Sequence, residues 1–144
     1  GEQGDPVTDD DQPTAQQSTP APLNILVVDD DAAVRRVSRR MLEQLGHHVS
    51  CVEDGEAAIE LYEDEMETDR SFDLVILDLT IPGGLGGKQA IKRLLAVDPS
   101  VRAVASSGYA DDPVMANFSD YGFADIIAKP YNLEQLRQVM SRAT

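Results

Sequence analysis

Acidic side chains stand at the ends of two apolar segments of this sequence. The run 23–28 is followed by Asp29, Asp30 and Asp31, and a second run, FDLVILD, ends at Asp78. Like charges in one site repel one another and raise the pKa of at least one carboxyl group. A hard cation relieves such repulsion, and Mg²⁺ prefers oxygen ligands of this kind. These residue types therefore predict a magnesium site, in which one carboxylate can act as a nucleophile toward a phosphoryl group.

Two other kinds of polar group end further apolar runs. Ser106 and Ser107 close one of them, and Lys129 follows another. In a parallel sheet, the carboxyl ends of the strands share one edge, and ligands bind there at the switch point of the strand order. We therefore expect these hydroxyl and ammonium groups to converge with the aspartates.

The elements that must position these groups alternate regularly from residue 23 onward. Apolar runs predict strands at 24–29, 48–52, 72–78, about 101–106 and 124–128, and an amphipathic helical pattern follows each of them. Strict alternation predicts an α/β fold with helices on both faces of a parallel sheet. With right-handed crossovers, the pattern favours a flavodoxin-like (βα)5 doubly wound sheet with strand order 2-1-3-4-5.

Helix ends can also be predicted from the sequence. Asp31, Asp54 and Asn132 stand where helix N-caps belong, and Gly46 stands just after the first helix. The segment 111–122 begins with an acidic cap and a proline and ends in a glycine, which predicts one helix over that range.

Composition limits the class of protein. The 144 residues carry a formal net charge of −14, which argues against nucleic-acid binding by this domain. A single cysteine excludes an internal disulfide and fits a reducing compartment. No apolar run of membrane-spanning length and no signal peptide is evident, so we expect a cytoplasmic domain without membrane contact.

The first 22 residues differ from the rest of the chain. They contain five acidic residues, four prolines and no lysine or arginine, a composition that cannot bury enough apolar surface to fold. We predict that residues 1–22 are a disordered linker or a tag remnant and that residues 23–144 form the folded domain.

Four short motifs carry a family resemblance. VVDD, LVILDLTIPG, SSGYA and AKPY occur in order and at suitable spacing, and from about Leu23 to Met140 the chain resembles the receiver domains of response regulators in two-component signalling. The resemblance implies that Asp78 is the phosphoacceptor and that Asp30 and Asp29 bind the metal, with the backbone carbonyl of Thr80 as a further ligand. The implied cation is Mg²⁺, with Mn²⁺ as an alternative.

The resemblance also assigns the groups that contact the phosphoryl group. It implies that Lys129 pairs with the phosphoryl oxygens and is followed by a cis peptide bond to Pro130. Counting back from the lysine favours Ser107 as the switch hydroxyl, while its place at the strand end keeps Ser106 open. Ile126 occupies a position where the family often has an aromatic switch residue.

Several local readings stay open beside this resemblance. In place of that aromatic residue, Tyr109 or Tyr131 could gate access to the site. The glycine-rich GGLGG loop predicts unusual mobility. The basic stripe of the first helix fits either a solvated face or a docking surface, and two histidines at 47–48 fit a surface position. The stripe comprises Arg35, Arg36, Arg39 and Arg40.

The implied function is a phosphorylation-controlled switch. A histidine kinase or a phosphotransfer histidine donates the phosphoryl group to Asp78, and the face formed by the fourth helix, fifth strand and fifth helix changes and signals to a downstream protein. Self-phosphotransfer and autodephosphorylation are expected, without turnover of an independent small-molecule substrate. Receivers often pair through the fourth and fifth helices, so a homodimer stays open.

The surroundings of the domain are a separate expectation. The chain ends soon after the last predicted helix, so we expect no output domain there. The linker and the SSGYADDPVMANF stretch favour the receiver module of a hybrid histidine kinase, bacterial or archaeal, as the cytoplasmic part of a membrane-bound sensor; a complete single-domain regulator is the alternative.

Three other classes compete with a phosphorylated receiver. A haloacid-dehalogenase-type phosphatase also uses a strand-end Asp and Mg²⁺, but it needs a second Asp at the position of Thr80. A flavodoxin needs a phosphate-binding loop after the first strand, where three aspartates would repel a phosphate. A receiver-like module without phosphorylation would not need the acids, hydroxyl and lysine together.

Overall fold

A single parallel sheet forms the centre of the computed structural model, which describes residues 21–82, 84–109 and 111–143. Most of the segment 1–22, predicted to be a linker, thus lies outside the described residues. The strand order is β4-β3-β5-β6-β7, which in chain order is 2-1-3-4-5 and confirms the prediction. The strands are β3 (Asn24–Val28), β4 (His48–Val52), β5 (Leu74–Asp78), β6 (Ala103–Ser107) and β7 (Asp125–Ala128).

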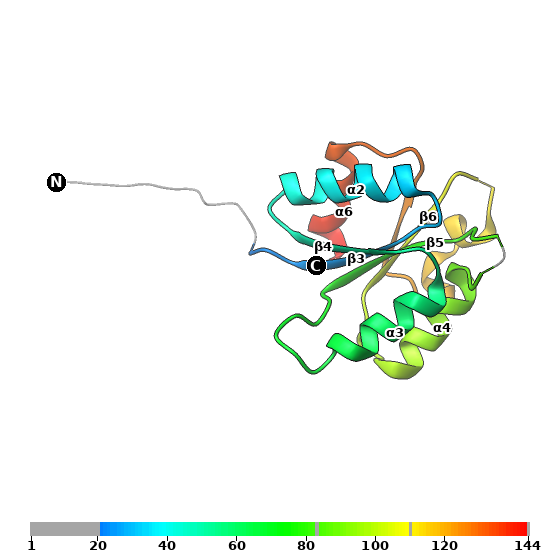
Figure 1. Ribbon diagram of the computed structural model, residues 1–144. Coiled ribbons are helices and arrows are strands. Elements are labelled where there is room, and N and C mark those ends of the chain that lie inside the picture. The colour runs from blue at the N-terminus through cyan, green and yellow to red at the C-terminus, as the bar shows by residue number, and fades with distance from the viewer. Residues whose placement is uncertain (1–20, 83, 110, 144) are drawn as a thin grey trace.

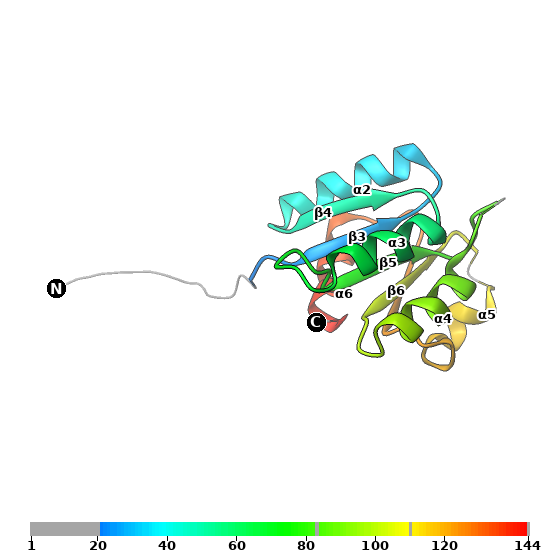
Figure 2. The same cartoon turned by 60° about the horizontal axis from the view of Figure 1, so that its bottom comes forward.

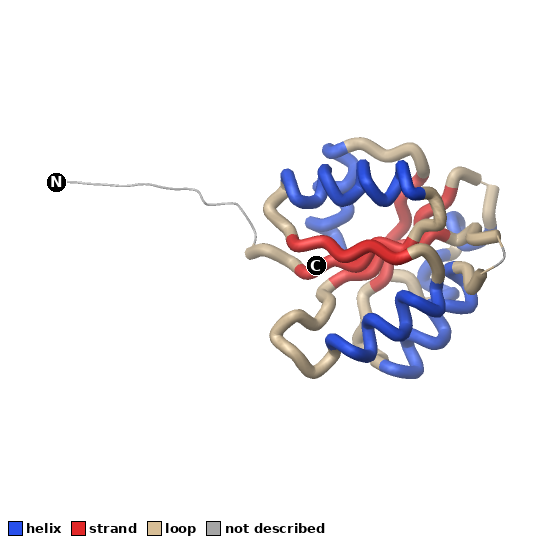
Figure 3. Tube along the Cα trace, viewed as in Figure 1, coloured by secondary structure: helices blue, strands red, loops and turns tan. Residues whose placement is uncertain are grey.

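Helices cover both faces of this sheet (Figures 1 and 2). Figure 3 shows the strands as a central layer between the helices, with α2 and α6 on one side and α3 and α4 on the other. The helices are α2 (Ala32–Gln44), α3 (Gly55–Glu65), α4 (Gly87–Val97), the short α5 (Pro113–Ala116) with the 3₁₀ helix η1 (Phe118–Tyr121), and α6 (Leu133–Ala143).

Two apolar clusters hold the layers together. Alternate residues of β5 supply both, because successive side chains of a strand point to opposite faces. Leu77 packs with Ile91 on the α3 and α4 side, and Ile76 packs with Leu42 and Leu136 on the α2 and α6 side. All of β5 is buried, as its unbroken apolar run predicts for a central strand.

The predicted caps are confirmed. Asp31 Oδ1 accepts hydrogen bonds from the backbone N–H groups of Ala33 and Val34, and Asp54 caps α3 in the same way. At the start of α6, Asn132 Oδ1 accepts from the N–H of Gln135, whose side chain accepts in return from the N–H of Asn132. This reciprocal pair is a capping box.

Some predicted boundaries were wrong. The segment 111–122 is not one helix: α5 ends at Ala116, because Asn117 has φ −131° and ψ 45°, outside the helical region, and the chain continues as η1. The third strand begins at Leu74 rather than residue 72, and the fourth begins at Ala103 rather than 101 and ends at Ser107. The first strand ends one residue earlier than predicted, at Val28.

The surface prediction was wrong for one of the two histidines. His47 is buried, and its Nδ1 accepts a hydrogen bond from the backbone N–H of Leu23 at 3.1 Å, whereas His48 is exposed. Burial, followed by the neighbouring charge of His48, lowers the pKa of His47 below its usual value of 6.5. The ring therefore joins the start of β3 to the end of α2 in its neutral form.

This neutral histidine predicts a pH-dependent stability. Because the folded state holds the pKa of His47 below its unfolded value, unfolding takes up a proton and the free energy of unfolding falls as the pH drops below 6.5. In the His47→Asn variant, whose carbonyl can still accept from Leu23, this part of the pH dependence should disappear. Urea unfolding of both proteins between about pH 7 and pH 5 measures it. Equal slopes in the two proteins would show that the pKa of His47 does not differ between the folded and unfolded states.

Two glycines form a matched pair for a second stability test. Gly46 and Gly122 both have a left-handed φ, 96° and 98°, and both follow a helix. A Cβ at Gly46 meets nothing within 4 Å, whereas a Cβ at Gly122 would lie 2.6 Å from Leu95 Cδ1. Gly46→Ala should cost about 1–2 kcal/mol from backbone strain, and Gly122→Ala should cost more because Leu95 must also move. Thermal unfolding compares them, and equal losses would refute the steric contribution.

Candidate metal centre

Three carboxylates converge at the carboxyl ends of two adjacent strands. One carboxylate oxygen from each of Asp29, Asp30 and Asp78 lies within 4.8 Å of those of the others. Asp29 and Asp78 are buried, and Asp30 is exposed at the mouth of the cluster. β3 and β5 are neighbours in the sheet, so residues about 50 apart in the sequence meet here, as the strand order predicts.

Asp29 is held from several directions. Its backbone N–H donates to the carbonyl of Val52, and its Oδ1 accepts from the N–H of Asp31 at 2.9 Å. The Arg35 guanidinium donates to its carbonyl oxygen at 2.7 Å. The turn from β3 into α2 thus fixes this carboxylate and leaves Oδ2 free of the turn.

Lys129 bridges the two buried carboxylates. Its Nζ lies 3.0 Å from Asp29 Oδ2 and 3.2 Å from Asp78 Oδ2. Burial lowers the pKa of Lys129, but the hydrogen bond that its ammonium donates to Asp29 and the charges of both carboxylates outweigh this effect and raise the pKa overall. The peptide bond from Lys129 to Pro130 is cis, as predicted.

The surroundings of Asp78 disfavour its ionised form. Burial first, and then the negative charge of Asp29, raise its pKa above the usual value. The backbone N–H of Thr80, 3.2 Å from Asp78 Oδ1, and the Lys129 ammonium act in the opposite direction. A carboxylate in this position gains stability from any further positive charge that reaches it.

The donor set fits a divalent oxygen-loving cation. Three aspartates set against one lysine leave an excess of two negative charges, and all the converging side-chain donors are carboxylate oxygens. Mg²⁺ takes such ligands together with water. Asp29, Asp30 and Asp78 would hold it, with the Thr80 carbonyl as the predicted additional ligand, and the bound ion would supply charge neutralisation for phosphoryl chemistry.

The two candidate hydroxyls are both buried at the end of β6. Ser106 pairs with Asp78 in the strand register, and Ser107 pairs with Ala128 just before Lys129. The Ser107 hydroxyl accepts from the backbone N–H of Tyr109 at 2.9 Å. Its own O–H donates to the carbonyl of Tyr109 at 3.4 Å, and a phosphoryl oxygen would compete for that donor. The choice of Ser107 over Ser106 stays a prediction.

The two tyrosines and the isoleucine at candidate gating or switch positions differ in their exposure to solvent. The Tyr109 side chain is exposed, whereas Tyr131 is half-buried and its hydroxyl lies 2.5 Å from Ser38 Oγ. Burial raises the pKa of Tyr131. Ile126 is partly buried and packs against the core on the α3 and α4 side. Of the two tyrosines proposed as gates, only Tyr109 projects into solvent.

The contacts that α2 makes with the site were not predicted from the sequence. The prediction treated Arg35 as part of a basic stripe, but this side chain binds the backbone of Asp29, while Arg36 and Arg40 are exposed. Ser38 is buried at a position where the helical period calls for an apolar residue. A polar residue on the apolar face of a helix was the signal that could have indicated a buried partner.

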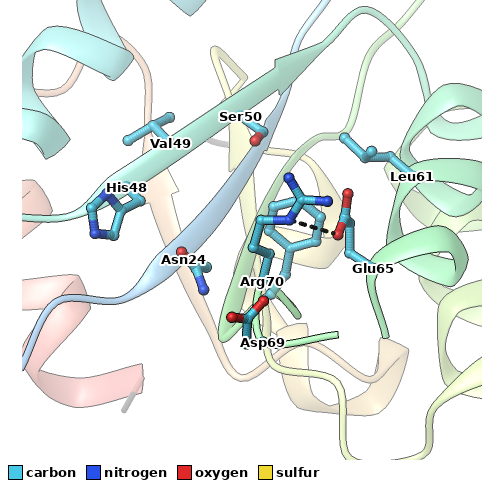
Figure 4. A pocket seen from close by; sticks show the side chains of 9 residues that line it. Asn24, His48, Val49, Ser50, Leu61, Glu65, Asp69 and Arg70 are labelled. Carbon is cyan, nitrogen blue, oxygen red and sulfur yellow. Dashed lines mark ion pairs between the residues drawn. The ribbon is translucent and has the colours of Figure 1, made fainter. Parts of the chain in front are cut away.

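A separate hollow lies at the opposite, amino-terminal end of the strands. It has a volume of about 490 Å³, and Asn24 and His48, the first residues of β3 and β4, line it. Two of its lining residues, Arg70 and Glu65, form an ion pair at 3.3 Å (Figure 4). None of the predicted site residues is among those that line this hollow.

The comparisons with known proteins decide the family. The family model described as the response regulator receiver domain matches residues 25–141. The chain belongs to the response regulator receiver domain family. The receiver domain is thus a module of two-component signalling, whose family binds Mg²⁺ at an acidic pocket, and the acidic cluster described above fits such a pocket. Among the described residues of the receiver domain, no helix is both long and apolar enough to cross a membrane.

Relatives of the receiver domain differ in length. Sporulation initiation phosphotransferase F of Bacillus subtilis is 25% identical over 118 residues, 82% of this chain and 90% of that protein. A cyclic di-GMP phosphodiesterase of Thermotoga maritima is 30% identical over 121 residues, 84% of this chain but only 31% of that protein. The receiver domain therefore spans about a third of that longer relative.

One solved structure resembles this chain and is matched over nearly the whole length of the solved chain. It is the receiver domain of a sensor histidine kinase from Pseudomonas aeruginosa PAO1, with a magnesium ion coordinated in its active-site cleft. It is 27% identical, with a TM-score of 0.73, and the match covers 85% of this chain and 98% of that one. This similarity agrees with the strand order found here.

Proposed function

We propose that this receiver domain accepts a phosphoryl group on Asp78 from a histidine kinase or a phosphotransfer protein in a Mg²⁺-dependent reaction. The observation that carries the proposal is the position of Asp78, which is buried, next to two other carboxylates and 3.2 Å from the Lys129 ammonium. An Asp78 carboxylate oxygen attacks phosphorus, the bond from phosphorus to the donor histidine nitrogen breaks, and that nitrogen keeps the bond's electron pair. The product is an acyl phosphate on Asp78.

The surrounding residues have distinct roles in this proposal. Asp29, Asp30 and the Thr80 carbonyl hold the cation, which offsets the charge of the incoming phosphoryl group. Lys129, now shared between Asp29 and Asp78, turns to the phosphoryl oxygens. Ser107 supplies a hydrogen bond to the same group. All of these groups act by position and charge, because little covalent chemistry is left for the protein to do.

The proposed output is a shift of the face formed by α5, β7 and α6. Lys129 follows β7 directly, and the backbone N–H of Lys129 donates to the carbonyl of Ser107 at 2.8 Å. Movement of the lysine and of the serine hydroxyl would thus act on the ends of both β6 and β7. Such a local change biases an existing equilibrium between two arrangements. A downstream protein then binds one of them.

We infer that the domain is the receiver module of a hybrid histidine kinase, with residues 1–22 as its linker. The similarity to a receiver of a sensor histidine kinase supports this inference, and the length match to sporulation initiation phosphotransferase F supports the single-domain alternative. The absence of direct nucleic-acid contact fits the net charge of −14, and the single cysteine fits the reducing compartment of a cytoplasmic location. Sequencing the coding region on both sides distinguishes the two arrangements.

The intact mass of the protein tests the central proposal. After incubation with acetyl phosphate and Mg²⁺, the protein should gain the mass of one phosphoryl group, and chelation of Mg²⁺ before the incubation should prevent the gain. A protein that gains no mass under these conditions would be a receiver-like module that signals without phosphorylation.

A further inference from the structure

We propose that Tyr131 and Ser38 position Lys129 for phosphoryl transfer, through the hydrogen bond that joins the loop after β7 to helix α2. This inference rests on the function proposed above. Ser38 Oγ and Tyr131 Oη lie 2.5 Å apart, and Ser38 is 1% exposed. Separating this pair is costly, because the buried Ser38 hydroxyl then lacks a partner. The bond therefore fixes the separation of two elements that are 93 residues apart in the sequence.

The loop that carries Lys129 is held by one contact at Lys129 itself and by another at Tyr131. At the start of the loop, the backbone N–H of Lys129 donates to the carbonyl of Ser107 at 2.8 Å. After it, Tyr131 packs against the apolar cluster of the α2 and α6 side and reaches Ser38. The backbone of Lys129 leads from the first contact toward the second, so a shift of Tyr131 would move the segment that carries the ammonium.

Helix α2 contacts Asp29, one partner of the ion pair, and also Tyr131, two residues after the other partner. Arg35 donates to the carbonyl oxygen of Asp29 at 2.7 Å, and Ser38 lies one turn further along the helix. Residues three apart on a helix share a face. One face of α2 thus sets the position of Asp29 through Arg35 and that of the lysine loop through Ser38.

Small movements of Lys129 would change its contacts with both carboxylates. Nζ is 3.0 Å from Asp29 Oδ2 and 3.2 Å from Asp78 Oδ2, both within hydrogen-bond range. A displacement of about half an ångström would weaken one of these bonds and misplace the ammonium for the phosphoryl oxygens. Tyr131 and Ser38 are therefore positioning residues, since they act through Lys129.

The experiment compares the rate of phosphorylation by acetyl phosphate in Tyr131→Phe, Ser38→Ala and the double variant. At saturating Mg²⁺, each single variant should be slower by about three- to tenfold. The double variant should be no slower than the slower single variant, because the three remove one shared contact. The Mg²⁺ concentration for half-maximal rate should not rise, because the three aspartates are untouched.

Tyr62→Phe is the matched control. Tyr62 is a buried tyrosine whose hydroxyl donates to Asp98 at 2.7 Å, on the other side of the sheet. This variant loses a hydrogen bond but should keep the wild-type rate. Single variants at the wild-type rate, losses that add in the double variant, or an equal loss in Tyr62→Phe would overturn the proposal. An unphosphorylated wild type would instead overturn the function itself, so the two failures are distinct.

Discussion

The Asp78→Asn protein should gain no mass when it is incubated with acetyl phosphate and Mg²⁺ under conditions that phosphorylate the wild type. An amide oxygen is a poor nucleophile, and the substitution keeps the size and shape of the side chain. The neighbouring Asp29 and Asp30 remain in place, so the variant asks whether the acceptor is Asp78 alone. Intact-mass spectrometry measures the outcome directly.

Asp125→Asn provides a matched control for this loss. Asp125 is also buried at a strand, at the start of β7, and it pairs with Arg142 at 2.9 Å outside the acidic cluster. This variant should be phosphorylated like the wild type. A mass gain in Asp78→Asn would move the acceptor to another residue, and a loss in both variants would trace the effect to folding rather than to chemistry.

The second large effect concerns stability. Mg²⁺ should raise the melting temperature of the wild type, because a ligand that binds only the folded state stabilises it by RT ln(1 + [L]/Kd). At a concentration 100 times the dissociation constant this amounts to about 2.7 kcal/mol, and Asp30→Asn should remove much of the rise. Differential scanning calorimetry with and without Mg²⁺ measures it.

Asp31→Asn is the sharpest control for that experiment, since it changes the neighbouring carboxylate. Asp31 caps α2, and asparagine caps a helix about equally well. Its Mg²⁺-dependent rise should match that of the wild type. Sodium chloride at equal ionic strength separates general screening from binding. If millimolar Mg²⁺ leaves the wild-type melting temperature unchanged, the acidic cluster is not a metal site.

The strand order and the convergence of the acids could be predicted because they depend on local patterns. Apolar runs identify parallel strands, and the residues that follow them must share one edge of the sheet. Asp29, Asp30 and Asp78 meet for this reason, and Asp31 caps a helix because of its place in the sequence.

Contacts between distant side chains could not be predicted in this way. The burial of His47 depends on the backbone N–H of Leu23, and the burial of Ser38 depends on Tyr131. Neither partner is visible in a local pattern. The break at Asn117 likewise follows from packing of η1 against its neighbours rather than from cap signals, which the segment 111–122 has at both ends.

The bridge made by Lys129 has a consequence for how the domain is made. The lysine directly follows the last strand, at one edge of the sheet, and reaches Asp29, 100 residues earlier, beyond β6 and β5. During synthesis, all three carboxylates leave the ribosome well before the residue that offsets their charge. A chain that stops short of β7 would thus carry the acids without their counter-charge. The complete centre can arise only after β7 has joined the sheet, so phosphorylation of Asp78 would also report that the sheet is complete.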